Sequence, residues 1–250
     1  MNLEPLLNIA IKAAEAACKE ILEVYHFADF ETQLKSDNSP LTLADKRAHE
    51  ALSKNLESTG LPVLSEEGKS IPYEVRKNWK QFWMVDPLDG TKEFIKRNDE
   101  FTVNIALIEN QEPILGVLAV PVSGIVYYGA KDLGAFKREA GRQLPVTGNQ
   151  EPATRVVASR SHMNKETEEY IAKLGRTEVV SAGSSLKFML LAEGKADIYP
   201  RFGPTMEWDT AAAHAILKEL GFRITKVDSD EGLTYNKENL LNPYFIACRP

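Results

Sequence analysis

Carboxylates suited to binding a metal ion lie in one short segment, Asp86-Pro87-Leu88-Asp89-Gly90-Thr91. The proline fixes its own φ angle and disfavours the helical region for Asp86, so the segment is predicted to form a preformed turn. Such a turn can direct both carboxylates and the Leu88 carbonyl at one point. Because magnesium prefers oxygen ligands in octahedral geometry, this spacing favours a magnesium site.

The residues after the turn are suited to holding an anion. Gly90 lets the backbone approach a ligand closely, and residues 92–95 are expected to begin a short helix whose amides attract phosphate oxygens. Two further acidic residues can join the site. Glu66 follows an apolar run that predicts a strand, and Asp209 begins a segment that predicts a helix.

Each acidic residue also has a structural interpretation. Asp86 and Asp89, taken singly, are more often turn residues than ligands, because Asp is common in Asp-Pro and Asp-Gly turns. Glu66, which precedes Glu67, can be an exposed acidic loop tip, and Asp209 can be a helix N-cap. The hypothesis of a metal site rests on the four residues together.

The rest of the chain predicts an α+β lobe over residues 1–150 and an α/β lobe over residues 151–250. Helical periodicity and turn-bounded apolar runs locate the elements, and three closely spaced strands after residue 100 predict an antiparallel meander. The expected helices are 6–25, 41–56, 165–174, 184–193 and 209–220, and the expected strands are 61–65, 81–86, 101–108, 114–120, 125–130, 155–158, 177–181 and 196–199.

Composition limits the classes of function. The net charge of the 250 residues is -6 with both signs interleaved, which argues against a nucleic-acid-binding surface. No apolar run is long enough to span a bilayer, and no signal peptide is predicted. Cys18 and Cys248 predict neither a zinc site nor a disulfide framework, so a reducing cytosol is expected.

Three segments resemble motifs of the inositol monophosphatase superfamily, in the expected order. They are residues 85–94 (VDPLDGTKEF), residues 208–217 (WDTAAAHAIL) and the acidic loop at residues 64–68 (LSEEG). Ala213 stands where the family usually has glycine, which leaves Asp209 unaffected. The resemblance implies a layered αβαβα sandwich of the inositol monophosphatase and sugar phosphatase type.

The resemblance also implies a ligand set for two to three magnesium ions. Glu66, Asp86 and the Leu88 carbonyl would hold one ion. Asp86, Asp89 and Asp209 would hold a second, and a third, more labile ion would lie near Glu66. In this arrangement the first lobe carries the metal-binding loops, and the second lobe supplies the last ligand and the contacts that select the substrate.

Direct hydrolysis of a phosphate ester is the implied reaction. Thr91 and Asp45 would orient or deprotonate the attacking water, with Glu66 as the third catalytic residue. Asp45 by itself would be read as a solvated helix carboxylate. Inhibition by lithium is expected, because a small monovalent ion can take the labile metal position.

Within the superfamily, the chain most resembles the CysQ-type 3′(2′),5′-bisphosphate nucleotidases. These remove the 3′-phosphate of adenosine 3′,5′-bisphosphate and can accept the sulfated analogue. Residues 159–162 and 183–187 carry this assignment, although His162 fits a surface histidine, Ser184 an N-cap and Lys187 a solvated lysine. The implied substrate-binding residues are Glu66, Leu88, Asp89, Gly90, Thr91, Ser159, His162, Ser184, Lys187 and Asp209.

Two other functions remain open from the sequence. One is a phosphatase of the same superfamily that acts on inositol monophosphate or a sugar bisphosphate. The other is a non-catalytic module that binds a nucleotide with magnesium. The expected partner is a small bisphosphorylated nucleotide, and the expected location is the cytoplasm or the cytoplasmic face of the inner membrane, although no basic amphipathic helix is predicted.

Overall fold

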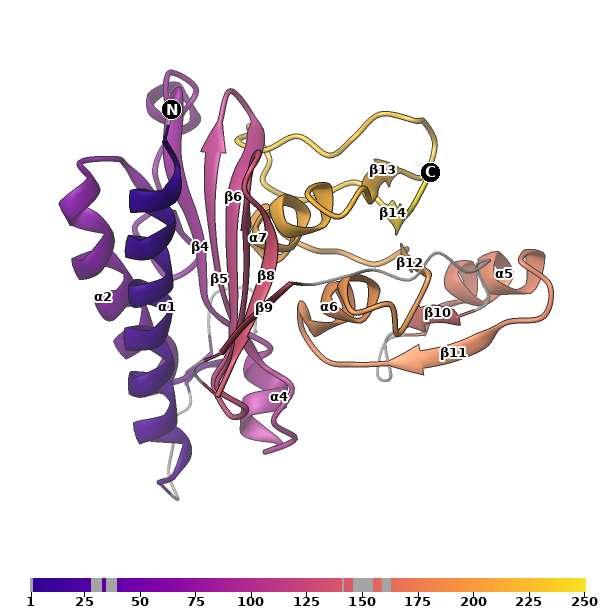
Figure 1. Ribbon diagram of the computed structural model, residues 1–250, viewed down its shortest axis with the longest axis horizontal. Helices are drawn as coiled ribbons and strands as arrows, with labels where there is room; N and C mark the ends of the chain where they lie inside the picture. Colours follow the sequence, from indigo (N-terminus) through magenta and orange to yellow (C-terminus); the bar gives the residue numbers. More distant parts are fainter. Residues whose placement is uncertain (1, 28–32, 35–39, 141, 146–154, 159–162) are drawn as a thin grey trace.

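The computed structural model describes residues 2–27, 33–34, 40–140, 142–145, 155–158 and 163–250. Its helices and strands alternate in layers of helix, sheet, helix, sheet and helix (Figure 1). The predicted αβαβα sandwich is therefore confirmed. Among the described residues, no helix combines the length and the apolar composition needed to cross a membrane.

The first sheet has seven strands in the order β3-β4-β5-β6-β7-β8-β9. Helices α1 (Glu4–Tyr25) and α2 (Leu43–Leu56) cover one of its faces (Figure 1). Strands β3 and β4 are parallel and all later pairs are antiparallel, so the predicted meander is confirmed. The strands are β3 (Val63–Ser65), β4 (Gln81–Asp89), β5 (Thr102–Glu109), β6 (Glu112–Val120), β7 (Ile125–Ala130), β8 (Gly134–Glu139) and β9 (Arg142–Pro145).

The second sheet has five strands in the order β11-β10-β12-β14-β13. Helices α6 (Leu186–Ala192) and α7 (Glu207–Lys218) lie between the sheets, and α5 (Lys165–Lys173) packs against β12 (Figure 1). The strands are β10 (Arg155–Ala158), β11 (Glu178–Ser181), β12 (Ile198–Arg201), β13 (Arg223–Lys226) and β14 (Phe245–Cys248). The short elements are β1 (Gln33–Leu34), β2 (Pro40–Leu41), α3 (Tyr73–Arg76), α4 (Thr91–Ile95) and a 3-10 helix at Glu57–Thr59.

Close packing of α7 on the first sheet places Asp209 near the metal loop. The alanines at 211–213 are almost fully buried, as expected of a helix enclosed on all sides. Gly116 of β6 allows this approach, because a Cβ there would lie 2.1 Å from the Ala212 carbonyl oxygen. Helix α7 is thereby held against β4, β5 and β6.

The structure differs from the predicted elements at several places. Strand β4 does not end at Asp86 but continues through Pro87 to Asp89, with a register shift that removes the proline from the regular ladder. Helix α2 begins at Leu43 and not at the predicted residue 41, because the Thr42 side chain caps it. The prediction omitted the short helix α3 and the strands β1, β2, β8, β9, β13 and β14, none of which is longer than six residues.

Candidate metal centre and active site

The structure brings together three of the predicted metal ligands, Glu66, Asp86 and Asp209. Each offers a carboxylate oxygen, and these oxygens lie within 4.8 Å of one another. Glu66 follows β3, and its amide donates to the Val85 carbonyl of the parallel strand β4 at 3.2 Å. Asp209 comes from the first turn of α7. Three elements distant in sequence therefore converge on one point.

A bulge in β4 shapes the central loop. Asp86 pairs with Asn104 of β5, and Asp89 pairs with Thr102, so β4 has one residue more than its partner between these pairs. The Leu88 amide donates to Asp86 Oδ1 at 3.0 Å and closes the turn predicted from the sequence. The bulge places Asp89 past the turn, where its charge acts on Asp209.

The electrostatics of Asp209 favour a cation beside the cluster. Burial raises the pKa of Asp209 well above its ordinary value, and the negative charges of Asp89 and Glu66 raise it further. Asp209 also accepts a hydrogen bond from the Met206 amide at 2.9 Å, but Met206 is the N-cap of α7 and Asp209 is its third helical residue, so the interpretation of Asp209 as the N-cap is wrong. Buried carboxylates need a compensating charge, and an all-oxygen donor set suits a hard divalent ion. The residues fit magnesium.

The predicted pair Thr91 and Asp45 is in contact. Thr91 Oγ1 donates to Asp45 Oδ1 at 3.1 Å, and the Asp45 side chain is only 1% exposed. Thr42 caps α2 and donates to Asp45 Oδ2 from its amide at 2.7 Å and from its hydroxyl at 2.6 Å. Asp45 is therefore not a solvated carboxylate but a fixed acceptor beside the metal loop.

The loop before α6 packs on the metal loop. Gly90 has a φ of 94°, and a Cβ there would lie 3.1 Å from Ser184 Cβ. The Ser184 hydroxyl lies 2.9 Å from the Thr102 hydroxyl, and α6 begins only at Leu186 with Ser185 at the N-cap position. The interpretation of Ser184 as the N-cap is therefore wrong, because its side chain is bonded to the first sheet instead.

Two cations lie beside the acidic cluster. Lys187 is only 9% exposed, so the interpretation as a solvated lysine is wrong. Burial lowers its pKa, and the nearby charge of Asp89 opposes that shift. Arg201, at the end of β12, lowers the pKa of Asp209, and its buried Nε has no hydrogen-bond partner in the described part of the chain. Sequence reasoning missed Arg201, although a cation just after a predicted strand was an available signal.

Two predicted nucleotide contacts, Ser159 and His162, lie outside the described residues. The strand that precedes them, β10, is present as predicted. Their contacts with a substrate stay predictions.

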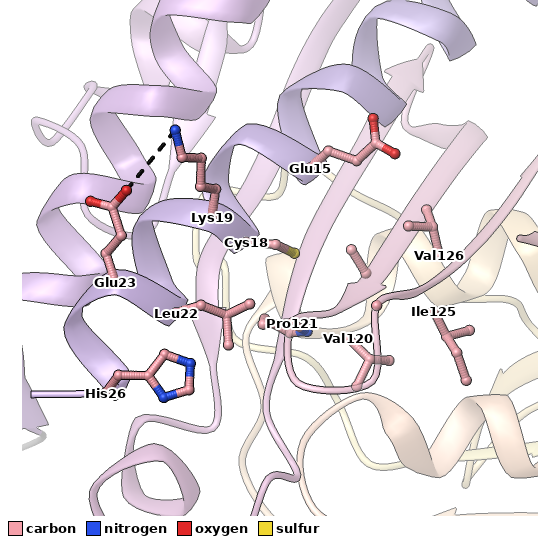
Figure 2. A pocket seen from close by; sticks show the side chains of 12 residues that line it. Glu15, Cys18, Lys19, Leu22, Glu23, His26, Val120, Pro121, Ile125 and Val126 are labelled. Atoms are coloured by element: carbon pink, nitrogen blue, oxygen red, sulfur yellow. Dashed lines mark ion pairs between the residues drawn. The ribbon is translucent and has the colours of Figure 1, made fainter. Parts of the chain in front are cut away.

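A separate cavity of about 550 Å³ lies between α1 and the turn that joins β6 to β7 (Figure 2). Burial raises the pKa of Cys18 in its wall to about 12, so this thiol is a poor nucleophile. None of the predicted site residues lines this cavity, which is formed by Glu15, Cys18, Lys19, Leu22, Glu23, His26, Ala119, Val120, Pro121, Gly124, Ile125 and Val126.

A layered αβαβα fold with a carboxylate cluster at the start of α7 defines a metal-dependent phosphatase of the inositol monophosphatase type. The model of the inositol monophosphatase family matches residues 2–244, and the chain belongs to this family.

Three relatives show how far the similarity extends. The chain is 47% identical to the 3′(2′),5′-bisphosphate nucleotidase CysQ of Salmonella typhimurium, over 97% of this chain and 98% of the relative. The crystal structure of CysQ from Bacteroides thetaiotaomicron has a TM-score of 0.89 and 47% identity, and the match covers 99% of this chain and 98% of that one. An inositol monophosphatase from Zymomonas mobilis is 26% identical with a TM-score of 0.79, over 99% and 94%.

Proposed function

We propose that this protein is a magnesium-dependent 3′(2′),5′-bisphosphate nucleotidase. It would hydrolyse the 3′-phosphate of adenosine 3′,5′-bisphosphate to give AMP and phosphate, and would accept the sulfated analogue. The observation that carries the proposal is the 47% identity with CysQ of Salmonella typhimurium over nearly the full length of both chains. The carboxylate cluster supplies the chemistry that such a reaction needs.

Five groups are proposed to hold two to three magnesium ions: the carboxylates of Glu66, Asp86, Asp89 and Asp209, and the Leu88 carbonyl. The proximity of Glu66, Asp86 and Asp209 supports this set. Magnesium bound there would acidify a water molecule and offset the negative charge of the phosphoryl group. In this proposal the carboxylates hold magnesium, and the water attacks the phosphorus atom itself. No protein residue becomes phosphorylated, so the reaction is direct hydrolysis.

Thr91, Asp45 and Glu66 are the proposed catalytic residues. The Thr91 hydroxyl directs its hydrogen to Asp45 at 3.1 Å, which leaves its oxygen lone pairs to accept a hydrogen bond from water. Asp45 is proposed to take up the proton of that water by way of Thr91, and two hydrogen bonds from Thr42 hold its carboxylate in position. Glu66 is proposed to help orient the same water.

Backbone amides and cationic side chains are proposed to bind the phosphate groups of the substrate. The Gly90 and Thr91 amides are proposed to contact the reacting phosphate at the start of α4. Lys187 and Arg201 lie where a second phosphate can pair with them, and the unpartnered buried Nε of Arg201 supports this assignment. A second phosphate would add negative charge beside the buried Lys187 and the partly buried Arg201, which favours a bisphosphate.

The other nucleotide contacts are assigned to the second lobe. Ser159, His162 and Ser184 are proposed to bind the nucleoside together with the cations described above. The division into lobes at residues 1–150 and 151–250 is part of this proposal, with the reaction assigned to the first lobe and the choice of ester to the second. The proposed location is the cytoplasm, and the proposed partner is the small bisphosphorylated nucleotide.

A substrate panel tests the proposed function. Phosphate release is measured with adenosine 3′,5′-bisphosphate, inositol 1-phosphate and fructose 1,6-bisphosphate at saturating magnesium. We expect the highest kcat/KM for the nucleotide. In Arg201→Met, which removes the charge while keeping the length, kcat/KM for the nucleotide is expected to fall by about 10-fold or more. Faster turnover of inositol 1-phosphate by the unmodified protein would overturn the proposal.

A further inference from the structure

We propose that Ser185 is a positioning residue that fixes the orientation of the metal ligand Asp89. The inference rests on the proposed function, because it concerns the same metal centre. It assigns a role to an uncharged side chain that is not among the site residues predicted from the sequence. The structural basis is a group of short hydrogen bonds between the N-cap of α6 and the end of β4.

Ser185 binds one oxygen of Asp89 twice. Its amide and its hydroxyl both donate to Asp89 Oδ2, each at 2.6 Å. Hydrogen bonds to an ionised acceptor are short and strong, and two donors from one residue restrict both the rotamer and the tilt of the carboxylate. In the described part of the chain, no side chain or amide donates to Asp89 Oδ1. One oxygen is thus held by protein, and the other is left for a ligand.

The Ser185 hydroxyl is itself held by the residues around it. It lies 2.7 Å from the Asp209 carbonyl oxygen, and it accepts a hydrogen bond from Asn104 Nδ2 at 3.0 Å. The single hydroxyl hydrogen favours the charged acceptor Asp89 over the neutral carbonyl. Ser185 is 2% exposed and Asn104 is 1% exposed, so water competes little for these bonds.

The position of Ser185 makes this use of its hydroxyl unusual. Serine at an N-cap ordinarily accepts a hydrogen bond from an amide of its own helix. Ser185 occupies the N-cap of α6, yet its side chain makes no capping hydrogen bond. The hydroxyl instead donates to Asp89 at the end of β4 and lies against the Asp209 carbonyl at the start of α7.

Tight packing before α6 keeps Ser185 in place. The Gly183 amide donates to Glu100 Oε2 at 2.8 Å. A Cβ at Gly183 would lie 2.7 Å from the Glu100 carbonyl oxygen, so only glycine allows the loop to approach this closely. Residues 183–185, the loop before α6, are therefore fixed relative to Asp89 through Ser185.

The test is magnesium binding to Ser185→Ala without substrate, measured by calorimetric titration of the metal-free protein and by the magnesium dependence of Tm. Removal of a residue that orients a metal ligand typically weakens metal affinity about 10- to 100-fold, and we expect a loss in this range. The matched control is Thr167→Ala on α5, which removes a buried hydroxyl that donates to Asn164 Oδ1 at 2.5 Å. Its magnesium affinity should equal that of the unmodified protein.

Unchanged magnesium affinity in Ser185→Ala would overturn the inference, as would an equal loss in Thr167→Ala. In an Asp89→Asn background, the further effect of Ser185→Ala on affinity should largely disappear, because Ser185 acts through that carboxylate. If Ser185→Ala does not fold, Ser185→Cys, with its weak donor, is titrated in the same way. A protein that binds magnesium as expected but releases no phosphate from the nucleotide would refute the proposed function and leave this inference standing.

Discussion

Replacing Thr91 with valine removes the hydroxyl that contacts Asp45 and keeps the shape of the side chain. Proton transfer by a positioned side chain is worth about 10²- to 10⁴-fold in rate, so kcat at saturating magnesium should fall within this range. The corresponding rise in barrier is about 2.7 to 5.4 kcal/mol. The lost hydrogen bond to a carboxylate costs about 1.5 kcal/mol of stability, because Thr91 is only half-buried, and the variant should remain folded.

The assay compares Thr91→Val with Thr91→Ser, which retains the hydroxyl. Steady-state phosphate release gives kcat and KM, and the magnesium dependence of Tm reports metal binding separately. We expect the serine variant to keep kcat within about 10-fold of the unmodified protein, and both variants to keep its half-saturating magnesium concentration. A valine variant that keeps more than a tenth of kcat would refute the assignment of Thr91 and Asp45 to water activation.

Two further predictions concern stability. Gly116→Ala should lower the free energy of unfolding by about 3 kcal/mol or more in urea titrations, because the added Cβ would lie 2.1 Å from the Ala212 carbonyl oxygen. The control is Gly232→Ala, because a Cβ there would lie 3.8 Å from its nearest neighbour, the Ile224 carbonyl oxygen. Equal losses of unfolding free energy in the two variants would contradict the packing argument. Burial lowers the pKa of His214 to about 3 from 6.5, so below pH 6.5 the unfolded chain binds a proton that the folded chain excludes. Between pH 7 and pH 5 the unmodified protein should therefore lose about 2 kcal/mol more than His214→Gln, and equal losses would contradict this.

The reaction centre could be predicted because its ligands lie in continuous, recognisable segments. Asp86 and Asp89 lie at the end of β4, and Asp209 lies in the first turn of α7. Both locations agree with the strand end and the helix start predicted from the sequence. The contact of Asp45 with Thr91 could be anticipated only from the resemblance, because the two residues are far apart in sequence and nothing in the segment around Asp45 marks it as buried. The meander was predictable from the close spacing of its strands.

The parts that could not be predicted depend on tertiary contacts. Ser185 lies next to Ser184, the expected cap, and only the contact between the start of α6 and the end of β4 reveals that the Ser185 hydroxyl is bonded to Asp89. The burial of Lys187 likewise depends on elements that are distant in sequence. Strands β8 and β9 escaped prediction because they have few apolar residues and no regular alternation of apolar with polar residues.

The most direct measurement of the central claim identifies the products formed from adenosine 3′,5′-bisphosphate. The protein is incubated with the nucleotide in magnesium and, in parallel, with excess chelator, and the products are separated by chromatography. We predict equal amounts of phosphate and 5′-AMP with magnesium, and no turnover with the chelator. Turnover that persists in the chelator, release of the 5′-phosphate, or absence of any product with magnesium would contradict the account.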